Sequence, residues 1–306
     1  MADAELRIIC GPTAAGKSAI ALSLAEHVPA TIVSADSRQV YRRFDIGTAK
    51  PTSAECRRVP HRGIDVVDPT ERYSAAAWAQ DAIRWIEEAT DARRTPVVVG
   101  GTGFYLRALA MPLFEEPPLD AERRAALARV LEPMSIPDLR RWCQQIDPAR
   151  AHLGRTQLLR AIEIGVLTGR PISAWHRERS RAPTVRARWL VLSPRAAVLA
   201  ERIEQRTDAM LRAGWEEEVR ELMQTVPEDA PAWNATGYEA VRERVRGALT
   251  RDGMRARIIV ETRQYAKRQR TWFRHQLPDE RVTRIDPADD HALDRARRWW
   301  SEGEAQ

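Results

Sequence analysis

Cysteine, lysine and long apolar runs are scarce in this chain of 306 residues. The three cysteines, Cys10, Cys56 and Cys143, lie far apart, which excludes a disulfide framework and offers no C-x-x-C zinc spacing. No apolar run approaches the ~20 residues that span a bilayer. The acidic N-terminus lacks the basic region of a signal peptide. These absences favour a globular protein of the reducing cytoplasm that does not enter a membrane.

Lysine is nearly absent although basic residues are common. Lys and Arg together number 49, and only Lys17, Lys50 and Lys267 are lysine, which leaves 46 arginines. A general bias toward arginine says nothing about function. A position that stays lysine against this bias is a candidate for a role that needs a compact ammonium group.

The positive charge is concentrated near the C-terminus. Residues Val241–His275 hold eleven Arg or Lys and three Asp or Glu, a local net charge of +8, whereas the whole chain carries +6. Such a block is either a surface for phosphates or nucleic acid or a solvated helix face.

Short β-branched runs alternate with helical patterns in the first hundred residues, which predicts a parallel α/β sheet. Ser74 is a plausible N-cap of the second helix, and Trp78, Ala82, Trp85, Ile86 and Ala89 share one face of it. The expected strands are Leu6–Cys10, Thr31–Ser34, Ile64–Val67, Val97–Val99 and, much later, Trp189–Ser193; the expected helices are Ser18–Glu26 and Ser74–Ala92.

A helical stretch interrupts the sheet pattern between two proline-containing segments. It shows no strong strand, so we expect an inserted all-helical domain at residues 113–185, with residues 1–112 and 186–306 forming the sheet core. The expected helices of the insertion are Ala121–Val130, Pro137–Gln145 and Thr156–Thr168; those that follow it are Ala196–Ala213, Trp215–Thr225, Tyr238–Ala248 and Met254–His275.

The segment Gly11–Ser18 matches the phosphate-loop pattern G-x-x-x-x-G-K-[ST] without deviation. It follows an expected strand and opens an expected helix, so the predicted core is P-loop NTPase-like. Backbone N–H groups and the helix N-terminus favour a phosphate there, Lys17 supplies a positive charge, and the Ser18 hydroxyl suits Mg²⁺. The expected diphosphate- or nucleotide-binding residues are Gly11, Pro12, Thr13, Ala14, Ala15, Gly16, Lys17 and Ser18.

A phosphate loop does not identify the polyphosphate that it binds. The Val97–Val99 strand runs into Gly100–Gly103 without the acid that ATPases usually place after such a strand. The only acid well placed after an early strand is Asp36, at the carboxyl end of Thr31–Ser34, where open α/β sheets bind ligands. Asp36 is therefore a candidate Mg²⁺ ligand, general base or helix N-cap.

An ordered set of motifs runs through roughly residues 6–275. The motifs include Gly11–Ser18, Ser34–Tyr41, Asp45–Pro51, Gly100–Leu106, Arg160–Glu163, Arg202–Met210, Gly237–Tyr238 and Thr262–Gln269. In this order they resemble the tRNA dimethylallyltransferases, also called tRNA isopentenyltransferases or IPP transferases. The resemblance implies transfer of a dimethylallyl group from dimethylallyl diphosphate to the N6 amine of the adenine 3′ of the anticodon in tRNA, with release of diphosphate.

The resemblance also implies roles for single residues. Asp36 would take a proton from the adenine amine, and Lys17, Thr102 and Arg206 complete the implied catalytic set. Arg206 would reach the diphosphate, and the alternative for it is a surface helix arginine. Mg²⁺ at Ser18 is the implied cofactor, the anticodon stem-loop and dimethylallyl diphosphate are the implied partners, and a monomer is weakly indicated.

The resemblance places the tRNA contacts in both expected parts of the chain. In place of the Asn-Asp pair and Arg that the family usually has, this chain has Leu153–Gln157, which leaves either a neutral contact or one relocated to Arg155. The implied contacts are Asp36, Ser37, Arg38, Gln39, Thr102, Arg124, Thr156, Gln157, Leu158, Leu159, Arg160, Gly237 and Tyr238.

Two other functions stay open on the residues alone. A P-loop small-molecule or nucleoside kinase would hold ATP at Gly11–Ser18 and use Asp36 to activate a hydroxyl, but a small substrate needs no basic block such as Val241–His275. An RNA-binding protein with a vestigial phosphate loop is disfavoured by the intact Lys17 and Ser18 together with Asp36.

Overall fold

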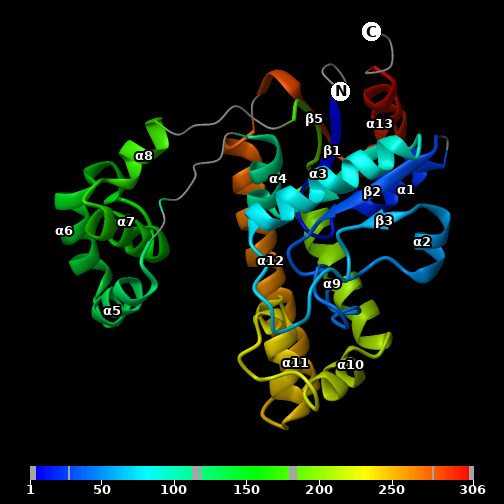
Figure 1. The fold of residues 1–306 in the computed structure, drawn as a ribbon. Helices are drawn as coiled ribbons and strands as arrows, with labels where there is room; N and C mark the ends of the chain where they lie inside the picture. Colours follow the sequence, from blue (N-terminus) through cyan, green and yellow to red (C-terminus); the bar gives the residue numbers. More distant parts are fainter. Residues whose placement is uncertain are drawn as a thin grey trace. The chain divides into compact units, whose positions relative to one another are not determined.

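The computed structural model describes residues 5–26, 28–111, 117, 119–178, 185–277 and 279–302, without the side chains of residues 176–178 and 279. The chain divides into two compact units (Figure 1). The sheet unit comprises Met1–Ala110 and Thr184–Gln306, and the helical unit comprises Met111–Pro183. These boundaries lie two residues from those expected from the sequence.

Six strands form one all-parallel sheet in the order β3-β2-β4-β1-β5-β6. The expectations for β1, β2, β4 and β5 are confirmed to within two residues at each end. Their near-continuous burial is typical of a parallel sheet covered on both faces. The strands are β1 (Leu6–Cys10), β2 (Ala30–Ala35), β3 (His61–Arg62), β4 (Thr95–Gly100), β5 (Ala187–Leu192) and β6 (Val282–Ile285).

The strand expected at residues 64–67 is wrong. β3 occupies His61–Arg62 instead, and Val67 forms only an isolated bridge with Tyr41. Gly63 and Asp65 have positive φ values of 77° and 54°, so the backbone turns where the apolar pattern predicted extended chain.

Helices cover the sheet and extend beyond it. α1 (Lys17–Ala25) and α13 (Ala292–Ser301) share one apolar cluster with β1, β4 and β5, and Trp299 and Trp300 are buried in it. α3 (Ala75–Asp91) contacts β2 and β4 and buries the five residues expected on one face. The Ser74 hydroxyl accepts a hydrogen bond from the backbone N–H of Ala77 at 3.1 Å, which confirms the predicted N-cap. The shorter helices α2 (Ser53–Arg58) and α4 (Gly103–Ala110) follow β2 and β4 in the chain.

The remaining long helices of the sheet unit form a bundle next to the carboxyl end of the sheet (Figure 1). α9 (Ala196–Arg212) and α12 (Arg251–His275) lie side by side. α10 (Trp215–Leu222) and α11 (Tyr238–Val245) pack on each other at the far end of this pair. The sequence predicted all four of these helices.

The helical unit has its own apolar core. Leu139, Cys143, Leu158 and Ile162 are fully buried in it. Three of its helices are confirmed to within one residue, and no strand occurs in the part of this unit that the structure describes. The helices are α5 (Ala121–Leu131), α6 (Ile136–Ile146), α7 (Arg155–Thr168) and α8 (Ile172–Glu178). Across residues 5–302, wherever the chain is described, no helix is long and apolar enough to cross a membrane.

Candidate active site

The phosphate loop joins β1 to α1 and has the backbone shape that its glycines allow. Gly11 has φ of +148°, and a Cβ atom there would lie 2.6 Å from the carbonyl oxygen of Leu192 on β5. Ala14 and Gly16 have φ of 60° and 90°. Lys17 folds back over the loop, and its Nζ donates a hydrogen bond to the Pro12 carbonyl at 2.7 Å.

The surroundings of Lys17 disfavour its charged form. Burial lowers the pKa of Lys17 to about 8; the Asp36 carboxylate opposes this shift, and the Arg206 guanidinium adds to it. Burial also lowers the pKa of Arg206, and Asp36 again opposes the shift. An anion bound beside these two cations would restore their charge and be stabilised by it.

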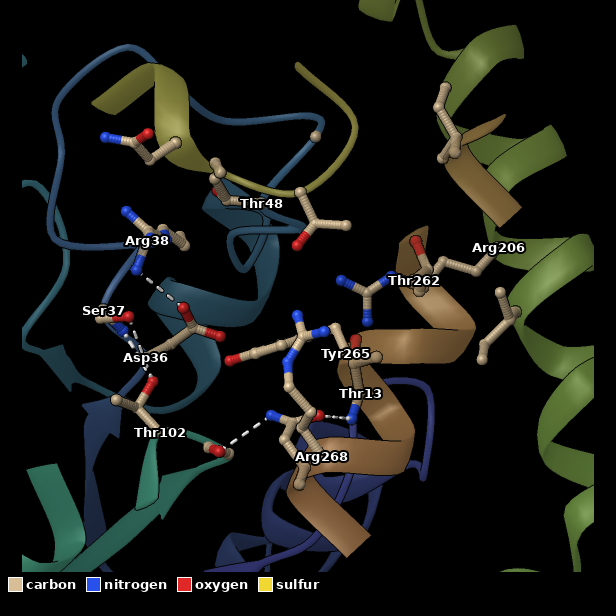
Figure 2. A pocket seen from close by; sticks show the side chains of 18 of the residues that line it. Thr13, Asp36, Ser37, Arg38, Thr48, Thr102, Arg206, Thr262, Tyr265 and Arg268 are labelled. Atoms are coloured by element: carbon tan, nitrogen blue, oxygen red, sulfur yellow. Dashed lines mark hydrogen bonds between the residues drawn. The ribbon is translucent and has the colours of Figure 1, made fainter. Parts of the chain in front are cut away.

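A cavity of about 430 Å³ opens at the carboxyl end of the sheet, where parallel α/β proteins bind ligands (Figure 2). Three kinds of element line it: the loops after β1, β2 and β4, the helices α9 and α12, and the turn before α11. The lining includes Thr13, Asp36, Ser37, Arg38, Thr48, Thr102, Phe104, Ile203, Arg206, Met210, Trp215, Thr236, Ile258, Thr262, Tyr265, Arg268, Gln269 and Trp272.

Asp36 directs its carboxylate into this cavity (Figure 2). One oxygen, Oδ1, accepts a hydrogen bond from the backbone N–H of Arg38 at 2.8 Å, so this contact holds the side chain against its own loop. The other oxygen has no hydrogen-bond donor among the described residues. The carboxylate therefore keeps one oxygen available to a ligand proton.

Thr102 connects the ends of β2 and β4. Its hydroxyl accepts a hydrogen bond from the backbone N–H of Ser37 at 3.0 Å and donates to the Ser37 hydroxyl at 3.4 Å. Its carbonyl begins α4 by accepting from Tyr105 and Leu106. Thr102 thus lies at the start of a helix, but its hydroxyl serves the cavity wall and not the helix cap.

Three arginines from different elements reach the cavity: Arg38 after β2, Arg206 on α9 and Arg268 on α12 (Figure 2). None of them has an ion-pair partner among the residues that the structure describes. Arg268 lies over the ring of Tyr265, with 5.7 Å between its Cζ and the ring centroid. The cavity therefore holds uncompensated positive charge around a single carboxylate, which suits a polyanionic ligand.

Part of the cavity lining is apolar. Ile203, Met210, Trp215 and Ile258 come from α9, α10 and α12, and two of these helices also carry Arg206 and Arg268. The cavity thus offers one ligand both charged groups for its phosphates and apolar side chains for a hydrocarbon part.

Ser18 offers a metal ion one hydroxyl. It is exposed at the start of α1, on a second cavity of about 620 Å³ that Lys17, Arg202 and Arg206 also line. No group of three or more His, Cys, Asp or Glu that could hold a metal occurs in the described parts of the chain. A single hydroxyl fits a Mg²⁺ that takes its other ligands from phosphate and water, and it does not fit an all-protein metal site.

Two of the residues expected to contact tRNA, Gln39 and Tyr238, form hydrogen bonds with other residues of the sheet unit. The Gln39 amide donates to the carbonyls of Thr48 and Ala49, and its oxygen accepts from Ser34. Tyr238 is fully buried, and its hydroxyl donates to Glu218 at 2.7 Å. An aromatic cluster encloses the Tyr238 side chain, whereas Gly237 beside it lines a surface pocket, and the tRNA contact expected at this turn stays a prediction.

Of the residues of the helical unit expected to contact tRNA, some are buried and others are exposed. Leu158 is fully buried and Leu159 packs on the same core, so the side chain of Leu158 contributes to stability, and the tRNA contact expected at these residues stays a prediction. Thr156 is exposed, and exposed Gln157 caps α7 by accepting from the N–H of Gly154 at 3.1 Å.

Arginines of the helical unit differ in what they bind. Arg155 donates to the carbonyls of Glu132 and Met134 at 2.5 and 2.6 Å, so it closes the turn between α5 and α6. Arg124 and Arg160 both pair with Glu163, and the Arg124 side chain remains 54% exposed.

The basic block on α11 and α12 is less uniform than its composition suggested. Arg255 pairs with Asp208, Arg257 with Glu243 and Glu261, and Arg263 with Glu204. Three other residues of α12, Tyr265, Arg268 and Gln269, line the cavity, and the sequence did not single them out. Their place in a family-like motif was the available signal, but a motif does not show which side of a helix meets a ligand.

Comparisons with known proteins agree on one family. The model of the IPP transferase family matches residues 39–276, and that of the isopentenyl transferases matches residues 4–64. A curated tRNA dimethylallyltransferase of Stenotrophomonas maltophilia is 43% identical over 282 residues, which cover 88% of this chain and 89% of the relative.

Solved structures give the same result for the fold. The tRNA isopentenylpyrophosphate transferase of Bacillus halodurans has a TM-score of 0.72 and 30% identity, with 98% of this chain and 97% of that chain covered. A eukaryotic dimethylallyltransferase, described as acting on tRNA, has a TM-score of 0.80 over 95% of this chain and 76% of its own. At 24% identity, that second likeness concerns the fold alone.

Proposed function

The chain belongs to the IPP transferase family, the tRNA dimethylallyltransferases, and we propose how its residues carry out prenyl transfer to tRNA. The dimethylallyl group moves from dimethylallyl diphosphate to the N6 amine of the adenine immediately 3′ of the anticodon. The observation that carries this proposal is the cavity in which Asp36 faces Arg206 and the phosphate loop. The relatives support this reaction and not the kinase alternative.

Asp36 serves as the base in this proposal. The adenine amine is a poor nucleophile because its lone pair is delocalised into the ring, so it needs close positioning and removal of a proton. As the N6–carbon bond forms and the carbon–oxygen bond to diphosphate breaks, the N6 proton passes to the free oxygen of Asp36. Thr102 supports this geometry through its hydrogen bonds with Ser37, the residue next to Asp36.

The leaving diphosphate gains negative charge on its bridging oxygen, and fixed positive groups must meet that charge. Lys17, Arg206 and the amides of residues 11–18 supply it in this proposal. The N–H of Thr13 is not among these amides, because it already donates to Gln269 at 2.8 Å. A bound Mg²⁺ at Ser18 would add positive charge next to the phosphate oxygens.

The apolar side chains of Ile203, Met210 and Ile258 accommodate the dimethylallyl group. The adenine has to leave the stack of the anticodon loop to reach Asp36, which is the usual solution for chemistry on a base. Arg124, Thr156 and Arg160 of the helical unit contact the anticodon stem-loop. Several basic residues of α12 have no ion-pair partner among the described residues, and they contact backbone phosphates. These residues are Lys267, Arg268, Arg270 and Arg274. The protein acts as a monomer in the cytoplasm, where its tRNA substrate resides.

One incubation tests this function. The protein is mixed with total tRNA, Mg²⁺ and dimethylallyl diphosphate labelled in the allyl group, without ATP. Label is expected in RNA, and nuclease digestion is expected to place it on the adenine 3′ of the anticodon. Absence of label in RNA, together with ATP turnover on a small acceptor, would contradict the proposal.

A further inference from the structure

The segment that forms one wall of the cavity has little regular structure of its own. Residues 36–50 run from the end of β2 through a series of turns and carry Asp36 at one end and Thr48 near the other. Arg43 and Ala49 lie in the left-handed region, with φ of 69° and 49°. Such conformations are unfavourable for residues other than glycine, so side-chain contacts must maintain the shape of the segment.

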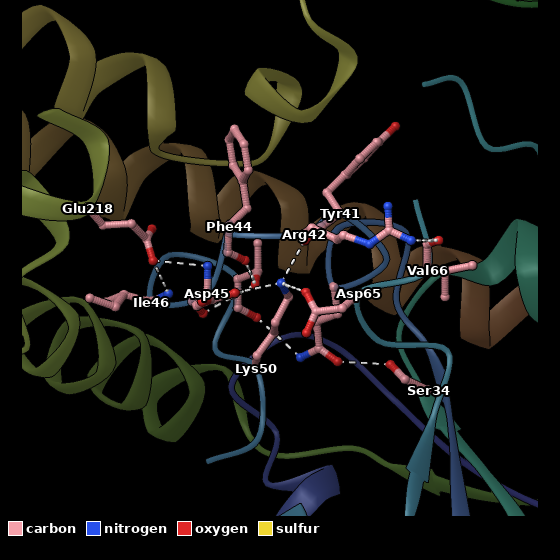
Figure 3. Close-up of polar contacts among 12 residues, drawn as sticks. Ser34, Tyr41, Arg42, Phe44, Asp45, Ile46, Lys50, Asp65, Val66 and Glu218 are labelled. Carbon is pink, nitrogen blue, oxygen red and sulfur yellow. Dashed lines mark hydrogen bonds and ion pairs between the residues drawn. The ribbon is translucent and has the colours of Figure 1, made fainter. Parts of the chain in front are cut away.

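Lys50 provides one set of these contacts (Figure 3). Its Nζ donates to the Tyr41 carbonyl at 2.6 Å, to Asp45 Oδ1 at 2.6 Å and to Asp65 Oδ1 at 2.5 Å. The side chain of Lys50 is only 6% exposed, whereas those of the two aspartates are 58% and 51% exposed. A single nitrogen at the end of the segment thus uses its three donors to join Tyr41 and Asp45 within the segment to Asp65 in the loop after β3.

This geometry explains why the position is lysine in a chain with 46 arginines. The three acceptors converge on one atom at the end of a thin, buried side chain. A guanidinium group spreads its donors over three nitrogens in a plane, so it cannot place three protons toward one point. An arginine would retain the charge at position 50 but would displace at least one of the three partners.

Glu218 on α10 holds the same turn from the other side. Its Oε2 accepts from the backbone N–H groups of Asp45 and Ile46 at 3.0 and 2.6 Å (Figure 3). Its Oε1 accepts from the buried Tyr238 hydroxyl, which fixes the carboxylate against α11. Gly47 approaches so closely that a Cβ there would lie 2.3 Å from the Trp215 side chain.

The turn at residues 45–48 is directly connected to the cavity. Gly47 and Thr48 line it, and Gln39 connects Thr48 and Ala49 to Ser34 on β2, two residues before Asp36. A change in the turn would therefore move Thr48 and the segment that carries Asp36. Errors of about 1 Å in the placement of reacting groups cost on the order of 10²-fold in rate.

We propose that Lys50 is a positioning residue for prenyl transfer: it acts through residues 41–49 to hold the base Asp36 and the Thr48 wall of the cavity. This role rests on the proposed function. It does not require contact between Lys50 and either substrate, because its ammonium group is already surrounded by protein acceptors.

The test compares Lys50→Arg and Lys50→Met with the wild type. Both variants are expected to lower kcat by roughly 10- to 100-fold, while the Kd for an anticodon stem-loop RNA and the KM for dimethylallyl diphosphate stay unchanged. Glu218→Ala should give the same split between kcat and KM, because it releases the same turn from α10. Arg84→Met removes an exposed cation that also pairs with two carboxylates, and it is the matched control with full turnover.

Hydrogen exchange on the free proteins separates this role from the reaction itself. Faster exchange confined to residues 41–50 in Lys50→Arg and Glu218→Ala supports the proposal, whether or not RNA is labelled. Normal kcat in Lys50→Arg would overturn it, as would exchange that increases throughout the sheet unit. Loss of label transfer in the wild type would contradict the proposed function, and the exchange pattern would still decide whether Lys50 orders the segment.

Discussion

Gln269 accepts a hydrogen bond from the backbone N–H of Thr13 at 2.8 Å, and the two residues lie 256 positions apart. The same side chain donates to the carbonyl of Gly101 at 2.8 Å, and it is almost completely buried. One amide of α12 therefore joins the phosphate loop to the end of β4. A Cβ atom at Gly101 would lie 2.5 Å from this amide nitrogen, so the glycine gives it the necessary space.

We predict that Gln269→Ala destabilises the protein. It leaves the Thr13 N–H and the Gly101 carbonyl without their partner, and a buried unsatisfied group costs about 1–3 kcal/mol. Urea unfolding followed by circular dichroism measures this change. Gln264→Ala on the exposed side of the same helix is the control and should change stability by less than ~0.5 kcal/mol. Equal effects of the two substitutions would show that the hydrogen bonds of Gln269 to Thr13 and Gly101 contribute nothing to the free energy of unfolding.

We predict that Asp36→Asn lowers kcat by roughly 10²- to 10⁴-fold, the usual contribution of a general base. An asparagine still accepts the hydrogen bond from Arg38 but does not take a proton, so tRNA affinity should be retained. Single-turnover transfer and filter binding of RNA measure the two effects separately. Asp91→Asn, at an exposed carboxylate on α3, serves as control. Unchanged turnover in Asp36→Asn would show that another group removes the proton.

We predict that diphosphate binding depends on the protonation of Lys17. The pKa of Lys17 is lowered from 10.5 to about 8 in the folded protein, chiefly by burial. As the pH rises through about 8, the wild type loses the charge while Lys17→Arg keeps it, so the affinity ratio of wild type to variant should fall. Isothermal titration with inorganic diphosphate at several pH values checks this ratio, which cancels the titration of diphosphate itself. A ratio independent of pH would contradict the shift.

The same lowered pKa has the opposite consequence for stability. The unfolded chain binds more protons than the folded one between pH 8 and 10.5, so the contribution of Lys17 to folding becomes more favourable as the pH rises through this window. Below pH 8, folding buries the charged ammonium group at a cost. The difference in stability between wild type and Lys17→Met should therefore decrease with rising pH. Urea unfolding at several pH values measures it, and a constant difference would contradict the assignment.

We predict that Arg124→Ala weakens tRNA binding and reduces its salt dependence. Arg124 is half-exposed beside Glu163, and loss of one phosphate contact should lower the slope of log K against log salt by about 1. Binding of an anticodon stem-loop RNA at several salt concentrations gives this slope. Arg141→Ala, which removes a more exposed arginine paired with Asp138, is the control in the same unit. Identical slopes for all three proteins would exclude Arg124 from the RNA contact.

Local patterns predicted four strands of the sheet and most of the longer helices, but they did not predict α2 or α13. The apolar runs of β1, β2, β4 and β5 and the capped amphipathic helix α3 illustrate the elements that were predicted. The prediction failed at residues 64–67, where positive φ values at Gly63 and Asp65 turn an apolar run away from the sheet. It also missed β6, a four-residue strand near the C-terminus that pairs with β5 at the edge of the sheet.

The candidate site was only partly accessible from the sequence. The phosphate loop and Asp36 follow from a motif and from the position of an acid after a strand. Thr102 and Arg206 came from resemblance, and the structure brings both to the cavity. Tyr238 and Leu158 belong to the same motifs but are buried, because a run of neighbouring residues on a helix covers both its exposed and its packed side.

The sequence by itself determined the phosphate loop, the parallel sheet with its helical insertion, and the family, because each depends on residues that are close together or on motifs in a given order. Only the tertiary structure decided which of 46 arginines face the cavity. It also decided that Gln269 binds the phosphate loop and that three acceptors converge on the Nζ atom of Lys50. These roles depend on acceptors that chain folding brings together from distant positions, and a compact amine or amide fits them only in that three-dimensional arrangement.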